Sequence, residues 1–213
     1  MIIPARFNGP PGSGNGGYSA GVLAGGADRE VTLLLPPPLD TPLTVTDDDV
    51  HDPDGRLVAR LAPLDGIEDA VPPVSPATAA EAATRYPGLT DHPFPTCYVC
   101  SPDRPDGLRV LAGPLPDGST AAPWTVPADL TPATVWAALD CPGGWAVIGS
   151  GRPFVLGRIG VRIARLPAVG DVCVVRGACT LIEGRKARVL TTLYGPDGAE
   201  LARARATWIR VGS

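Results

Sequence analysis

The stretch that most constrains the fold is 131–149, TPATVWAALDCPGGWAVIG. Thr131 is a good N-cap and Pro132 suits the first turn of a helix, so a helix is predicted to begin here. Its side chains are nearly all apolar, and Asp140 is the one acid among them. Such a helix must be covered on most of its surface, and the segments after it have the pattern of strands. We therefore predict a sheet curled around a central helix, which Pro142-Gly143-Gly144 interrupts just after Asp140.

The remaining chain alternates short helices with candidate strands. Four consecutive strands with short connections follow the central helix, and short connections require antiparallel neighbours. We expect these strands at 154–166, 171–182, 185–194 and 199–211. Before the central helix we expect helices at 18–25 and 76–86, a strand at 30–35, and hairpins that pair 43–46 with 56–61 and 107–112 with 119–126. The first half thus repeats the plan of the second half in shortened form.

Composition excludes several classes of protein. No run approaches the roughly 18 apolar residues of a membrane span, and no targeting segment is apparent, so we expect a cytoplasmic protein without membrane contact. The net charge is −4 and no basic strand face carries aromatic residues, which disfavours nucleic acid as a partner. Five cysteines, an odd number, favour reduced thiols over a disulfide framework. No cofactor is predicted, and a homo-oligomer is left open.

Two glycine motifs near the N-terminus suggest other chemistries. Gly17-Tyr18-Ser19-Ala20-Gly21 fits the G-x-S-x-G nucleophile elbow, which needs a buried strand before it and a histidine late in the chain. A Pro/Gly loop precedes the motif, and no histidine follows His92. The stretch 12–17 fits G-x-G-x-x-G, which needs a βαβ unit that an antiparallel chain does not provide. We expect Ser19 to be a small residue in helix packing.

The pair Cys97-x-x-Cys100 has the spacing of half a tetrahedral zinc site. The remaining ligands would come from Cys141, His92 or His51, none of which stands at a zinc-finger spacing. The alternative is a pair of half-buried thiols. A zinc site of Cys97, Cys100 and Cys141 therefore stays open, as an alternative to a site without metal.

Four patches of the sequence resemble hotdog-fold thioesterase-like proteins, most of all the actinobacterial double-hotdog type. They are FNGPPGSGNGGYSAGVLAGG (7–26), FPTCYVCSPDRPDGLRV (94–110), VWAALDCPGGWA (135–146) and EGRKARVLTTLYGPDGAELARARATWI (183–209). The resemblance implies an α+β double hotdog, in which two central helices are each wrapped by a curved antiparallel sheet. It implies an abbreviated hotdog unit with a Pro/Ala-rich linker at 1–96 and a second hotdog unit at 97–213.

The resemblance also implies where a site would lie. In hotdog thioesterases a backbone N–H at the helix N-terminus of one unit polarises the thioester carbonyl, and a carboxylate of the other unit activates water or attacks. The matching positions are Asn15, Gly16 and Gly17 opposite Asp140. A helix start offers N–H groups to a developing oxyanion, and an acid among apolar residues is expected to have a raised pKa. The family often has histidine where Asn15 stands, and neither half carries both parts, so we expect at most one complete site.

The function implied is hydrolysis of an acyl-CoA or related thioester, with a hydrophobic acyl group bound between the two units. We expect Asp140 as base or nucleophile, Gly16 and Gly17 as oxyanion donors and Asn15 as an orienting residue. The expected substrate contacts are Tyr18, Trp136 and Trp145. The alternative is a non-catalytic protein that binds acyl-CoA or a small hydrophobic ligand in a degenerate site, with Asp140 in a structural role.

Overall fold

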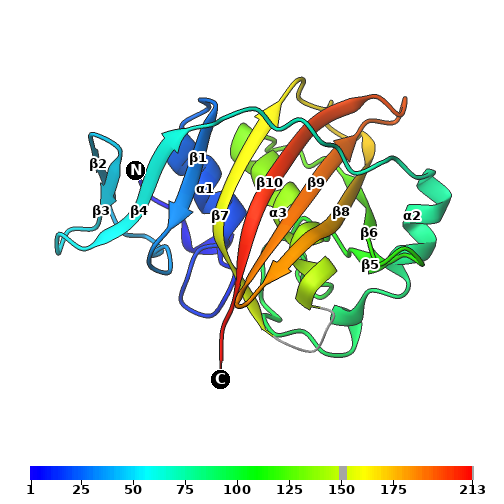
Figure 1. Ribbon diagram of the computed structural model, residues 1–213, viewed down its shortest axis with the longest axis horizontal. Helices are drawn as coiled ribbons and strands as arrows, with labels where there is room; N and C mark the ends of the chain where they lie inside the picture. The colour runs from blue at the N-terminus through cyan, green and yellow to red at the C-terminus, as the bar shows by residue number, and fades with distance from the viewer. Residues whose placement is uncertain (149–152, 213) are drawn as a thin grey trace.

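The computed structural model describes residues 1–148 and 153–212. Within these ranges, ten strands form one antiparallel sheet, accompanied by three α-helices and two short 3-10 helices (Figure 1). The helices are η1 (Ala5–Phe7), α1 (Gly16–Ala24), α2 (Pro76–Ala83), η2 (Pro87–Leu89) and α3 (Pro132–Ile148). The strands are β1 (Arg29–Leu33), β2 (Thr44–Thr46), β3 (Asp49–His51), β4 (Leu57–Pro63), β5 (Gly113–Pro114), β6 (Thr120–Thr125), β7 (Phe154–Ile163), β8 (Val172–Glu183), β9 (Lys186–Tyr194) and β10 (Glu200–Arg210). Their order across the sheet is β2-β3-β4-β1-β7-β10-β9-β8-β6-β5.

The central helix α3 runs through Pro142-Gly143-Gly144 to Ile148, so the predicted interruption is wrong. The glycines are needed because the helix lies directly on the sheet. A Cβ on Gly143 would stand 2.7 Å from a methyl carbon of Val189, and one on Gly144 would stand 2.4 Å from the ring of Trp208. Proline and glycine inside a helix cost about 3 and 1 kcal/mol relative to alanine. Burial of α3 against the sheet offsets this cost.

The sheet presents small side chains to α3. In β10, Ala202, Ala204, Ala206 and Trp208 are buried, whereas the alternating Arg203, Arg205 and Thr207 are partly exposed. This is the alternation that a half-buried strand requires, and it lies in the strand expected at 199–211. In Figure 1, α1 and α3 both lie behind the sheet. The alanines leave room for α3 to approach the strands closely.

The two predicted hairpins differ from the observed pairing. β3 lies in the acidic connection and pairs with both β2 and β4, so 43–46 and 56–61 do not pair directly. Asp47, at φ 52°, makes the extra turn between β2 and β3. The segment 107–112 is not a strand, because Arg109 has a φ of 53° and breaks the extended backbone. The hairpin partner of β6 is instead the two-residue β5, and β8 pairs with the other side of β6.

The N-terminal elements join the rest of the sheet through β1, which pairs with β4 on one side and β7 on the other. α1 packs against β1 and β7 and against α3. It has nine residues, about half the length of the 17-residue α3, and it begins two residues before the predicted helix at 18–25. A Cβ on Gly17 or on Gly21 would stand 2.7 Å from the α3 backbone, at Trp136 and Ala133 respectively. Two glycines one turn apart therefore bring α1 into backbone contact with α3.

The Pro/Ala-rich segment after β4 crosses the sheet and leads to α2, which packs against β6 (Figure 1). Val71 fixes this crossing: its N–H donates to Thr192 Oγ1 at 2.9 Å, and its carbonyl accepts from Tyr194 Oη at 2.6 Å. The segment expected to be a linker is thus packed on strands of the C-terminal half. None of the described helices is long and apolar enough to cross a membrane.

Candidate functional site

The N-terminus of α1 meets α3 at a single carboxylate. Asn15 caps α1, since its side-chain oxygen accepts the Tyr18 N–H at 2.8 Å. The Gly17 N–H donates to Asp140 Oδ2 at 2.9 Å, and the Asn15 amide donates to the same oxygen at 3.2 Å. A Cβ on Gly17 would lie 2.5 Å from Asp140 Cβ, so glycine is required for this approach. The structure therefore brings Asn15, Gly16 and Gly17 next to Asp140.

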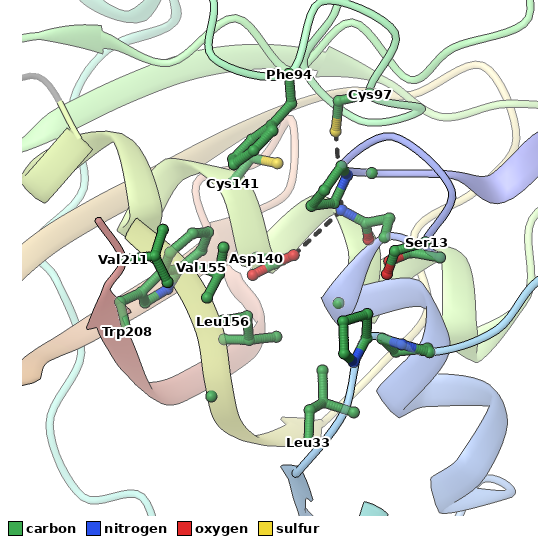
Figure 2. A pocket seen from close by; sticks show the side chains of 18 of the residues that line it. Ser13, Leu33, Phe94, Cys97, Asp140, Cys141, Val155, Leu156, Trp208 and Val211 are labelled. Carbon is green, nitrogen blue, oxygen red and sulfur yellow. Dashed lines mark hydrogen bonds between the residues drawn. The ribbon is translucent and has the colours of Figure 1, made fainter. Parts of the chain in front are cut away.

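The Asp140 carboxyl is buried, with 2% of the residue exposed. Burial raises its pKa to about 7; the hydrogen bond from Gly17 opposes the rise, the nearby Cys97 thiol adds to it, and the amide of Asn15 lowers it again. Asp140 Oδ1 has no hydrogen-bond partner among the described residues. In Figure 2 one oxygen of Asp140 is joined to a dashed line, and the other lies on the side of Val155 and Leu156. One carboxylate oxygen is thus held in place, and the other is left to accept a proton.

A cavity of about 490 Å³ lies beside this carboxylate (Figure 2). Its size is within the usual range for a pocket that binds a small molecule. Large apolar side chains form most of its wall: Leu33, Phe94, Trp145, Leu156, Trp208 and Val211. Among the described lining residues, Asp140 is the one carboxylate and there is no lysine or arginine. The cavity therefore suits an uncharged apolar group, and any phosphate of a ligand would lie outside it.

The two glycines at the start of α1 differ in what their N–H groups do. The Gly17 N–H is occupied by Asp140. The Gly16 N–H has no hydrogen-bond partner in the described part of the chain, and Gly16 lines the cavity. An N–H in the first turn of a helix carries partial positive charge and needs an acceptor. Gly16, rather than both glycines, is therefore the available donor.

Of the three aromatic residues predicted to contact substrate, one lines the cavity and two do not. Trp145 lines the cavity. Tyr18 stacks on Phe7 with ring centroids 3.7 Å apart, and Trp136 packs against Gly21 between α1 and α3. Neither is among the described residues that line the cavity. Both belong to helix packing.

Sequence reasoning missed most of the apolar wall of the cavity, including Phe94, Leu156 and Trp208. Phe94, Leu156 and Trp208 contribute to the wall from three different segments. For Trp208 the alternation with Arg203, Arg205 and Thr207 along the chain was a usable signal of burial. Nothing in the local sequence around Phe94 or Leu156 separates a cavity wall from an ordinary core position.

A cluster of thiols adjoins the carboxylate. The Sγ atoms of Cys97, Cys100 and Cys141 all lie within 4.8 Å of one another, and all three residues are buried and line the cavity. Donation from the side chains of Cys100 and Cys141, and from the Cys100 and Val99 N–H groups, holds the pKa of Cys97 well below its usual value despite burial. His92 lies beside this cluster, 3.4 Å from Cys100 Sγ, whereas His51 is in β3 near the other end of the sheet.

Sequence comparisons give no relative: neither a protein family nor a curated protein matches the chain. Solved structures do match. A conserved protein of unknown function with hot dog fold, from Alicyclobacillus acidocaldarius, matches 99% of this chain and 92% of its own, with a TM-score of 0.62 and 13% identity. A candidate thioesterase from Novosphingobium aromaticivorans matches 99% of this chain and 94% of its own, with a TM-score of 0.61 and 17% identity. The chain has the hotdog fold.

This result confirms the hotdog fold that the four sequence patches suggest, and the double-hotdog arrangement stays a prediction. At such low identities, similarity to the two hotdog proteins shows the fold of this chain but not its activity. The hotdog sheet observed here is antiparallel throughout and covers α3 from β6 to β7. The chemistry of the site therefore depends on what Asp140, the start of α1 and the cavity can do together.

Proposed function

We propose that this hotdog chain hydrolyses an acyl thioester, such as an acyl-CoA, whose hydrophobic acyl group enters the cavity. The observation that carries the proposal is the Asp140 carboxylate. It is buried, its Oδ2 is fixed by two donors, and its Oδ1 is without a partner among the described residues. A buried oxygen without a partner costs about 1–3 kcal/mol, a cost that a reacting water or substrate relieves.

The proposed reaction uses two groups from two helices. Asp140 Oδ1 takes a proton from a water molecule, which attacks the thioester carbonyl carbon. The negative charge that develops on the carbonyl oxygen is stabilised by the Gly16 N–H at the start of α1, and one such donor is typically worth about 10²–10³ in rate. The C–S bond then breaks, and the leaving thiolate takes up the proton. Gly17 and Asn15 position the carboxylate and do not contact the substrate.

The same proposal explains the two-part architecture as a double hotdog, with units at 1–96 and 97–213. Each unit contributes one helix to the proposed site, α1 from the first unit and α3 from the second. The sheets of the two units meet where β1 pairs with β7, at Val31 and Ile159. The donor would come from α1 and the acid from α3, as in a site shared between two units. The reciprocal site lacks its parts, because α3 begins with a proline that has no N–H and α1 carries no acid. One site per chain follows.

The experiment compares wild type with Asp140→Asn on a panel of acyl-CoAs of increasing chain length. Turnover is followed by the loss of thioester absorbance, because five cysteines would react with a thiol reagent. Asp140→Asn keeps the shape of the side chain, and we expect it to lose about 10²–10⁴ in kcat. Asp129→Asn is the matched control, since Asp129 is exposed and pairs with Arg6 away from the cavity.

Equal turnover by wild type and Asp140→Asn would remove Asp140 from the chemistry. Wild type that gains thermal stability with acyl-CoA but releases no thiol would contradict hydrolysis and support the non-catalytic binding function. That second function is favoured by one observation, namely that Asp140 already occupies the Gly17 N–H.

A further inference from the structure

Three thiols from two separate segments converge beside the cavity. Cys97 and Cys100 lie in the loop that precedes β5, and Cys141 lies in α3. Their Sγ atoms are all within 4.8 Å of one another. Zinc bound by thiolates has Zn–S distances of about 2.3 Å, which in a tetrahedron places the sulfur atoms about 3.8 Å apart. A small closure of the cluster would therefore give three ligands to one ion.

Hydrogen-bond donors lie next to two of the three sulfur atoms. The Asn15 amide donates to Cys97 Sγ at 3.9 Å (Figure 2). His92 Nδ1 accepts the Phe94 N–H at 3.0 Å, which assigns the imidazole proton to Nε2. Nε2 lies 3.4 Å from Cys100 Sγ and 3.3 Å from the Cys100 carbonyl oxygen, so its N–H faces these two acceptors and Nε2 is not a metal ligand. Buried thiolates that bind a metal need such N–H donors around them.

We propose that the thiolates of Cys97, Cys100 and Cys141 bind one zinc ion, whose fourth position faces the cavity and holds a water molecule. Soft thiolate ligands select zinc over hard cations such as magnesium or calcium. Each ligating thiol gives up its proton to solvent, and no atom is oxidised or reduced. Because the three residues line the cavity, the ion would be open to a bound molecule, as in zinc sites that take a water or substrate as fourth ligand.

The ion would tie the loop of Cys97 and Cys100 to α3 beside Asp140. This proposal does not depend on thioester hydrolysis, because it rests on the thiol cluster alone. The competing arrangement is a Cys97–Cys100 disulfide, which would leave Cys141 unused. All five cysteines are free in the structure.

The test uses the full chain, purified under reducing conditions, stripped of metal with a chelator and titrated with Co²⁺ as a spectroscopic probe. We expect a thiolate-to-cobalt charge-transfer band that saturates at one equivalent and is abolished by added Zn²⁺. Cys97→Ser and Cys141→Ser each remove one ligand and should lose most of the band. Cys179→Ser is the matched control and should keep it, since the Cys179 thiol contacts Leu181 in β8, outside the cluster.

A second measurement needs no variant and so is independent of whether the serine variants fold. The alkylation rate of each cysteine is measured on wild type by mass spectrometry, with and without Zn²⁺. We expect Zn²⁺ to slow the alkylation of Cys97, Cys100 and Cys141 at least tenfold and to leave Cys179 unchanged. No band with Co²⁺, a band that survives in Cys141→Ser, a Cys97–Cys100 disulfide under these conditions, or no protection by Zn²⁺ would each overturn the proposal.

Discussion

The contact between α1 and α3 at Gly17 can be tested with one methyl group. Gly17→Ala places a Cβ 2.5 Å from Asp140 Cβ and 2.7 Å from the Trp136 carbonyl oxygen. Packed carbon atoms stand about 3.5–4.0 Å apart, so α1 must move away from α3 by about 1 Å. Overpacking of this kind costs about 1–3 kcal/mol, and the better helix propensity of alanine returns up to about 1 kcal/mol. We therefore expect the free energy of unfolding to fall by about 1–2 kcal/mol.

The same shift should affect the site. The Gly17 N–H donates to Asp140 Oδ2 at 2.9 Å, and a displacement of about 1 Å breaks this bond and misplaces the carboxylate. A misplacement of that size can reduce the rate about 10²-fold. Urea unfolding and turnover of an acyl-CoA are measured on Gly17→Ala and on Gly66→Ala, where no described atom lies within 4 Å of the added methyl. We expect the stability of Gly66→Ala to change by less than about 0.5 kcal/mol. Wild-type stability and turnover in Gly17→Ala would mean that close contact at Gly17 neither holds α1 against α3 nor positions Asp140.

Two further variants test the cap and the cavity wall. Asn15→Ala removes the acceptor of the Tyr18 N–H and a donor to Asp140, so we expect a loss of about 1–2 kcal/mol in urea unfolding together with a loss of turnover. Asn15→Ser keeps a capping oxygen but removes the amide donor to Asp140, so it should keep more of the stability than Asn15→Ala and still lose turnover; equal turnover in both variants and wild type would contradict this role. Leu156→Ala enlarges the cavity and should cost about 2–5 kcal/mol while shifting turnover toward longer acyl chains. Leu181→Ala, at an exposed position, should change neither property, and an unchanged chain-length profile in Leu156→Ala would exclude Leu156 from the acyl site.

The sequence predicted those elements that depend on residues close to one another along the chain. The apolar run of 131–149 predicted a buried helix, and the short connections between the last three strands predicted their antiparallel pairing. Pro142-Gly143-Gly144 was misjudged because helix propensity opposes these residues, whereas close packing on Val189 and Trp208 requires two of them to lack a side chain. Such a requirement depends on the partner strands and cannot be seen within the helix itself.

The site could be predicted only as a set of residues and not as an arrangement. Asp140 and the Asn15-Gly16-Gly17 start of α1 were paired through a family resemblance, and the structure places them in hydrogen-bonding contact. Which glycine keeps a free N–H was not predictable, because it depends on where the carboxylate sits. Tyr18 is buried against Phe7 for a similar reason: an aromatic side chain serves a core or a pocket equally well until its neighbours are known.

The most direct test of thioester binding between Gly16 and Asp140 is a crystal structure of the Asp140→Asn protein with an acyl-CoA that it turns over slowly. We expect the acyl chain to fill the cavity beside Leu156 and Trp208. The thioester oxygen should accept the Gly16 N–H, with the carbonyl carbon next to the side chain at position 140. An acyl-CoA bound elsewhere on the molecule, or a thioester oxygen directed away from the start of α1, would contradict this expectation.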